Sequence, residues 1–96
     1  MKYLLIDDCR TFHVDKIART AEEGKKELAT KQYDVLVLDH DLGYGETGYD
    51  ILCWAFNNKC LPKRVQLCSM NPAGLKAMAN KLRDMGYEGK ADFIKK

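Results

Sequence analysis

The sequence lacks any long hydrophobic run, and this absence limits where the protein can act. No apolar stretch among its 96 residues approaches the ~20 residues that a membrane-spanning helix needs. The apolar stretch near the start ends at Asp7 and is too short for a signal peptide. We therefore expect a cytoplasmic protein that has no membrane partner.

An excess of one charge and a metal-binding cysteine pattern are also missing. Sixteen Lys and Arg residues stand against 14 Asp and Glu residues, so bulk charge gives no argument for binding nucleic acid. The four cysteines form no CxxC pair and no zinc-finger spacing, and we expect them to be reduced. Cys53 and Cys68 are interpreted as packing residues of a helix and a strand rather than as catalytic thiols.

Hydrophobic patterns and helix-capping signals predict alternating strands and helices within a single domain, residues 1–96. The expected strands cover residues 2–6, 14–19, 33–38 and 64–69. The expected helices cover residues 21–31, 49–59 and 71–86. Residues 91–94 fit either a short edge strand or a loose tail. This order is typical of an α/β fold with a mostly parallel sheet of four to five strands and about three helices.

Acidic residues follow two of the predicted strands at the point where each ends. Asp7 and Asp8 follow the first strand, and Asp39, His40 and Asp41 follow the third. All-apolar strands are typical of the middle of a parallel sheet, and the carboxyl edge of such a sheet binds ligands. Four carboxylates held close together repel each other, and a divalent cation would relieve that repulsion.

We therefore predict that Asp7, Asp8 and Asp39 bind Mg²⁺ or Mn²⁺, with Asp41 as a further candidate ligand. The alternative is that these acids only end their strands and face water. His40 lies between acids, so its pKa is expected to rise, which would suit a general acid or base near neutral pH. A His40 turned away from the acids by strand alternation is an equal alternative.

Hydrogen-bonding groups near these acids predict a phosphate site. Asn71 and Pro72 place a helix N-terminus beside the end of the fourth strand, and Ser69 adds a hydroxyl. Arg10 could hold a phosphate through two parallel hydrogen bonds, although a solvated surface charge is the alternative. Gly43, Gly45 and Gly48 allow a mobile or tightly turned loop over the site.

Three ordered motifs resemble the cyclic-phosphate processing receiver domains of bacteria and phages. The motifs are Ile6-Asp7-Asp8-Cys9-Arg10, Asp39-His40-Asp41-Leu42-Gly43 with Thr47-Gly48-Tyr49-Asp50, and Ser69-Met70-Asn71-Pro72-Ala73-Gly74. The resemblance implies a compact receiver-like (flavodoxin-like) fold, with three layers or a truncated two. It also implies metal-dependent action on a phosphodiester, either a cyclic-phosphate nucleotide or an RNA end. For a phage protein, the location would be the cytoplasm of the bacterial host.

The candidate catalytic residues that follow from this resemblance are Asp39, His40, Asp41 and Ser69. Cys68 departs from the family pattern, because members often carry a His at this position. The chain also resembles response-regulator receivers, in which Asp39 stands at the phosphoacceptor position and Lys95 or Lys96 is an uncertain match to the receiver's Lys. A phospho-accepting signalling receiver therefore stays open, as does a module that binds a nucleotide or a protein without turnover.

Both helices that would cover one face of a receiver sheet are missing from the predicted elements. Asp39 can share a site with Asp7 only if residues 7–13 return along the first strand in extended form. Seven or eight residues reach ~25 Å, which is enough. The helix-free face would expose apolar residues, so we expect a second copy to cover it in a symmetric homodimer. The alternative is that residues 9–13, with Phe12, cover this face.

Overall fold

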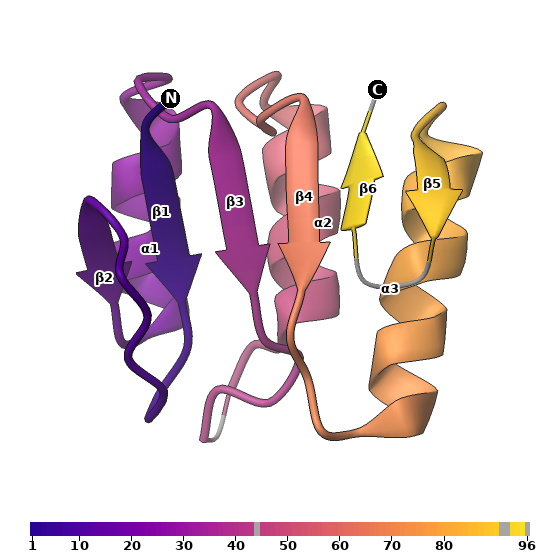
Figure 1. Cartoon of the computed structure of the whole chain (residues 1–96), viewed down its shortest axis with the longest axis horizontal. Helices are drawn as coiled ribbons and strands as arrows, with labels where there is room; N and C mark the ends of the chain where they lie inside the picture. The colour runs from indigo at the N-terminus through magenta and orange to yellow at the C-terminus, as the bar shows by residue number, and fades with distance from the viewer. Residues whose placement is uncertain (44, 91–92, 96) are drawn as a thin grey trace.

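A mostly parallel sheet organises the chain, and the helices lie behind it in Figure 1. The computed structural model describes residues 1–43, 45–90 and 93–95. The strands are β1 (Tyr3–Ile6), β2 (Lys16–Ala18), β3 (Val35–Leu38), β4 (Arg64–Leu67), β5 (Glu88–Lys90) and β6 (Phe93–Lys95). The helices are α1 (Ala21–Ala29), α2 (Gly48–Asn57) and α3 (Pro72–Asp84). The three helices of the described chain all cover the same face of the sheet. The fold is therefore the truncated two-layer form rather than the three-layer form.

The strand order is β2-β1-β3-β4-β6-β5, and the first four strands in this order are parallel. Within the described residues the sheet has six strands, one more than the upper end of the predicted range of four to five. The chain after α3 forms an antiparallel pair, in which β6 also pairs with β4. The edge strand on this side of the sheet is therefore β5, whose sequence Glu-Gly-Lys carries no apolar signal. Residues 91–92 of the predicted last element lie outside the described residues.

Local signals explain where the helices begin and end. Thr20 caps α1 by accepting a hydrogen bond from the Glu23 N–H, and Thr47 forms a capping box with Asp50 at α2. The first two helices end before the predicted residues 31 and 59, because Lys31 and Lys59 both have a left-handed φ of 58°. No helix in the described part of the chain is long and apolar enough to cross a membrane.

Close glycine contacts fix the helices against the ends of the strands. A Cβ at Gly48 would lie 2.1 Å from the Asp39 carbonyl oxygen, so only glycine lets α2 begin against the end of β3. A Cβ at Gly24 would lie 2.6 Å from Ile6 Cδ1. The absence of a side chain at Gly24 therefore allows α1 to pack closely on β1.

The connector between β1 and β2, residues 7–15, returns along β1 as predicted. At its far end the Asp15 N–H donates to the Tyr3 carbonyl over 3.1 Å, and the Tyr3 N–H donates to Asp15 Oδ2 over 2.7 Å. Figure 1 shows the connector rising beside β1 before β2 runs parallel to it. This return is what allows β1 and β3 to present their carboxyl ends at the same edge.

The face without helices is not an exposed apolar patch, which corrects the expectation drawn from the sequence. Leu5 and Val35 are 0% exposed and Val37 is 3% exposed, and Val14 and Ile17 pack against this group. The larger core lies between the sheet and the helices. The connector therefore covers much of this face, and the homodimer stays a prediction that has lost its original support.

Candidate active site at the carboxyl edge of the sheet

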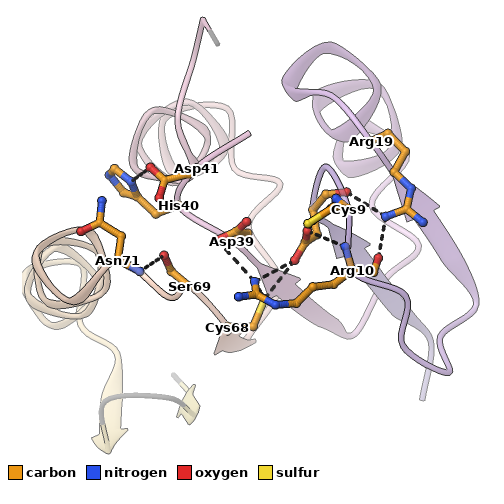
Figure 2. A network of polar contacts seen from close by, with 10 residues as sticks. Cys9, Arg10, Arg19, Asp39, His40, Asp41, Cys68, Ser69 and Asn71 are labelled. Carbon is orange, nitrogen blue, oxygen red and sulfur yellow. Dashed lines mark hydrogen bonds and ion pairs between the residues drawn. The ribbon is translucent and has the colours of Figure 1, made fainter. Parts of the chain in front are cut away.

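The parallel strands bring two buried carboxylates to the same face of the sheet. Asp7 follows Leu5 by two residues and Asp39 follows Val37 by two, and Leu5 pairs with Val37 in the register of β1 and β3. Asp7 is 0% exposed and Asp39 is 6% exposed, and they are the buried charged residues of the described chain. Buried carboxylates require compensation by hydrogen bonds or opposite charge, and Figure 2 shows the network that supplies it.

Asp7 is compensated almost entirely by the connector. Its Oδ1 accepts hydrogen bonds from the Cys9 N–H over 3.0 Å and the Arg10 N–H over 2.9 Å, and its Oδ2 accepts one from Arg10 Nη1 over 3.1 Å. Burial by itself would raise the pKa of Asp7, but these hydrogen bonds and the guanidinium charge outweigh it and lower that pKa. Asp7 is therefore a firmly ionised group that also shapes the loop.

The buried charge of Asp39 is compensated less completely, although Asp39 shares the Arg10 guanidinium with Asp7. Arg10 Nη1 lies 3.7 Å from Asp39 Oδ1, which makes the guanidinium an ion-pair partner of both acids. Burial and the nearby charge of Asp7 raise the pKa of Asp39, and Arg10 offsets them only in part. The interpretation of Arg10 as a solvated surface charge is wrong, because its side chain lies between two buried carboxylates.

Arg19 holds the connector in place, a role that no sequence pattern indicated. Arg19 donates hydrogen bonds to the Asp7 carbonyl over 3.2 Å, to the Arg10 carbonyl, and to Thr11 Oγ1 over 3.0 Å. All three acceptors belong to the loop that carries Arg10. A lone arginine at the end of a short strand has no distinguishing pattern, so only the folded chain identifies it.

We expect Arg19→Ala to lower the free energy of unfolding by about 2 kcal/mol, because it removes hydrogen bonds from a charged donor. Arg19→Lys should recover less than half of this loss, since lysine lacks the planar fork of donors. Urea unfolding of both variants measures the effect. Arg64→Ala is the matched control, because Arg64 contacts Met1 at the other end of the sheet. Equal losses for Arg19→Ala and Arg64→Ala would contradict the assignment.

Cys68 completes this group on the β4 side. Its Sγ lies 3.7 Å from Asp7 Oδ2 and 3.9 Å from Arg10 Nη1. Burial and the charges of Asp7 and Asp39 raise the pKa of Cys68 to about 12. A thiol that stays protonated is a poor nucleophile, which agrees with the prediction that Cys68 is a structural residue.

His40 and Asp41 form a second group, turned away from Arg10. His40 Nδ1 lies 3.0 Å from Asp41 Oδ1, and the His40 ring lies where a Cβ at Gly74 would come within 2.5 Å. Hydrogen bonding to His40 lowers the pKa of Asp41, although slight desolvation opposes it, and the Asn71 amide adds to the lowering. Figure 2 shows Asp39 facing Arg10 while His40 and Asp41 lie beside Asn71. His40 therefore keeps a contact with one of its flanking acids, Asp41, while it points away from Asp39 and Arg10.

The predicted phosphate donors at α3 are partly occupied within the chain. Asn71 Oδ1 caps the helix by accepting a hydrogen bond from the Gly74 N–H over 3.1 Å, and Ser69 Oγ accepts one from the Asn71 N–H over 3.0 Å. The Ser69 hydroxyl still has its own proton to donate. Binding of phosphate by Ser69 and Asn71 stays a prediction.

The carboxylates of Asp7 and Asp8 could hold a hard divalent cation at this edge, whereas the third residue grouped with them is the thiol Cys9 rather than the predicted Asp39. Ligand atoms of Asp7, Asp8 and Cys9 lie within 4.8 Å of one another, and Asp8 is exposed to solvent. Asp39 is linked to this group through Arg10. Mg²⁺ and Mn²⁺ favour carboxylate oxygens together with water, which an open, carboxylate-rich edge provides. The predicted tight loop also lies here, since Gly43 has a φ of +90° and a Cβ on it would lie 3.8 Å from Asp8 Oδ2.

Lys95 does not reach the site, which corrects its match to the receiver's Lys. Because β6 is antiparallel to β4, Lys95 pairs with Arg64 at the start of β4. Asp39 follows the end of β3, whose last residue pairs with Leu67 at the end of β4. Lys95 therefore lies at the opposite edge of the sheet from Asp39. Lys96 lies outside the described residues.

Comparison with known families agrees with this architecture. Residues 2–84 match the family model of the cyclic-phosphate processing receiver domain. The chain belongs to this family. All three motifs that suggested the family lie inside the matched range, and the receiver-like α/β fold expected from them is confirmed. The search among curated proteins found no match.

One solved structure shows the same fold. It is described as the yeast Spc42 trimeric coiled coil fused to another structure, and the likeness has a TM-score of 0.63 at 20% sequence identity. The likeness covers 82% of this chain and 60% of that one, so the receiver-like domain spans less than two thirds of the fusion. At this identity the comparison supports the fold alone.

Proposed function

We propose that this receiver-like domain hydrolyses a cyclic phosphodiester, on a nucleotide or an RNA end, in a reaction that depends on Mg²⁺ or Mn²⁺. The observation that carries the proposal is the contact of one guanidinium, Arg10, with two buried carboxylates at the carboxyl edge of the sheet. Membership of a family named for cyclic-phosphate processing supports the same class of substrate.

Asp7, Asp8 and Asp39 would hold the cation. The cation, when bound, supplies positive charge that polarises the phosphoryl group. Arg10 neutralises Asp7 and Asp39 in the present arrangement, with distances of 3.1 and 3.7 Å. Once these acids hold the cation, Arg10 is free to turn its guanidinium to the phosphate, for which its planar donor fork is well suited.

Proton movement falls to the second group of residues. Asp41 contacts Nδ1 of His40, so Nε2 would be the nitrogen that exchanges a proton with the attacking water or the leaving oxygen, once the substrate extends from Arg10 to His40. Ser69 can donate its hydroxyl proton to a phosphoryl oxygen. This division places charge neutralisation at Asp7, Asp39 and Arg10, and proton transfer at His40 and Asp41.

The test incubates the protein with Mn²⁺ or Mg²⁺ and a panel of cyclic mononucleotides, cyclic dinucleotides and RNA with a 2′,3′-cyclic phosphate end. We expect a linear monophosphate product that appears with metal and disappears with EDTA. Asp8→Asn should raise the Mn²⁺ concentration needed for half-maximal rate by about tenfold, as expected for loss of one carboxylate ligand. Asp84→Asn, an exposed carboxylate of α3, is the matched control and should change nothing.

Two outcomes would count against hydrolysis. No product from any member of the panel, together with a mass increase of one phosphoryl group on Asp39 from a small phosphodonor, would favour a signalling receiver. Tight binding of a nucleotide without product or phosphorylation would favour a binding module.

A further inference from the structure

A small hollow lies on the helix-free face, next to the carboxylates. It has a volume of about 160 Å³ and is lined by Tyr3, Phe12, His13, Val14, Val37 and Gln66. We call this hollow the connector groove, because Phe12, His13 and Val14 form one wall and residues of β1, β3 and β4 form the other. The connector groove adjoins the residues of the candidate active site.

Both walls of the connector groove continue into the site. On the sheet side, Val37 precedes Asp39 by two residues and Gln66 precedes Cys68 by two, so each pair lies on the same face about 6.6 Å apart. On the connector side, Phe12 follows Arg10 by two residues. A ligand whose phosphate lies at Arg10 and Asp39 would therefore place its next chemical group, one sugar ring away, in the groove.

The lining of the groove suits a heterocyclic base. Phe12 is 42% exposed and offers an aromatic ring for stacking. Within the described residues, the Gln66 amide and the His13 ring have no hydrogen-bond partner, so their polar atoms are available to a ligand. A volume near 150 Å³ holds a single six-membered aromatic ring, which fits a pyrimidine better than a purine. The Gln66 amide both donates and accepts, as does the edge of uracil or cytosine.

We propose that the connector groove binds the base of the substrate, and that the substrate is a pyrimidine nucleoside carrying the cyclic phosphate. This inference rests on the proposed function, because it assigns the phosphate to Arg10 and Asp39. A larger cavity of about 390 Å³, lined by Phe56, Lys59, Leu61, Lys63 and Tyr87, lies beside the start of β4. That cavity is at the edge of the sheet opposite Asp39, and a base bound there could not share a ligand with the acids.

The test measures binding of a product-like probe that cannot be turned over. Uridine 3′-monophosphate, adenosine 3′-monophosphate and ribose 5-phosphate are titrated into the protein with Mg²⁺ and followed by amide NMR shifts. We expect the uridine compound to bind about tenfold more tightly than ribose 5-phosphate, as stacking of one base provides. The adenosine compound should bind more weakly than the uridine compound. The largest shifts should fall on Phe12, His13 and Gln66.

Two variants and one matched control separate the groove from the rest of the surface. Phe12→Ala should remove most of the tenfold advantage, and Phe12→Trp should restore it. Phe56 is 41% exposed, almost the same as Phe12, so Phe56→Ala is the matched control and should keep the full advantage. Gln66→Leu, which keeps the volume without a polar atom, should weaken binding of the uridine compound, whereas the part of the preference over adenosine that the groove's size sets should remain.

The outcomes distinguish this inference from the proposed function. Equal binding of the three probes, or shifts centred on Phe56 and Tyr87, would overturn the base-binding groove even if the protein hydrolyses cyclic phosphates. Groove-centred binding of the uridine compound that Phe12→Ala weakens would support the groove even if no cyclic phosphate is turned over. In that case hydrolysis fails and the base-binding site stands.

Discussion

Asp39→Asn is expected to lower the rate of cyclic-phosphate hydrolysis by about 100-fold or more while raising the melting temperature of the metal-free protein. The fall in rate follows from removing a charged metal ligand whose electrostatic role no other residue is expected to take over. The rise in melting temperature follows because burial and the charge of Asp7 disfavour the ionised form of Asp39 in the folded protein and raise its pKa. An asparagine keeps the carbonyl oxygen that accepts the backbone hydrogen bonds of His40 and Asp41.

The dependence on pH gives this prediction a second test. Because the folded protein binds a proton at Asp39 more readily than the unfolded chain, ionised Asp39 destabilises the wild type at neutral pH. This penalty disappears as the pH falls through the raised pKa of Asp39 towards the ordinary value of 3.8. The stability advantage of Asp39→Asn should therefore be largest near pH 7 and vanish in acid.

The wild type and Asp39→Asn are compared by thermal unfolding in EDTA between acid pH and pH 7. Rate measurements in Mn²⁺ complete the comparison. Added Mn²⁺ should raise the melting temperature of the wild type and have little effect on Asp39→Asn. A variant that is both inactive and less stable without metal would show that Asp39 is a structural residue, and the charge argument would then be wrong.

Apolar runs made much of this fold predictable. A buried parallel strand needs apolar residues on both faces, and β1 and β3 show this in a continuous form. Their parallel pairing requires the connector to return along β1, and this return places β2 parallel to β1 at the edge of the sheet. The hairpin of β5 and β6 was missed in part because Glu-Gly-Lys carries no periodic pattern, and its pairing depends on the free edge of β4.

The candidate site was predictable as a location but not as a network. The acids that follow β1 and β3 were placed at the same edge because parallel strands present their carboxyl ends together. The partner of each acid depends on loop conformation, which composition does not reveal. Arg19 is recognisable only in the closed connector, and the side that His40 faces is decided by the lack of a side chain at Gly74.

Asp7→Ala is expected to lower the free energy of unfolding by about 3 kcal/mol, the opposite of the effect at Asp39. It leaves the Cys9 and Arg10 N–H groups and the Arg10 guanidinium without their acceptor, in a place where Asp7 is fully buried. For a domain of this size the melting temperature should fall by more than about 10 °C. Asp8→Ala is the matched control for stability, since Asp8 is exposed, and should stay within about 0.5 kcal/mol of the wild type.

The sign of the pH effect follows from the lowered pKa of Asp7. The unfolded chain binds a proton at this residue more readily than the folded protein, so Asp7 stabilises the fold above pH 3.8, and this contribution is lost as the pH falls through the folded pKa. The deficit of Asp7→Ala should therefore shrink in acid. Urea unfolding at several pH values gives the free energy of unfolding of Asp7→Ala, of Asp8→Ala and of the wild type under the same conditions. Deficits that are equal at Asp7 and Asp8, or that do not depend on pH, would show that the connector does not depend on the Asp7 carboxylate.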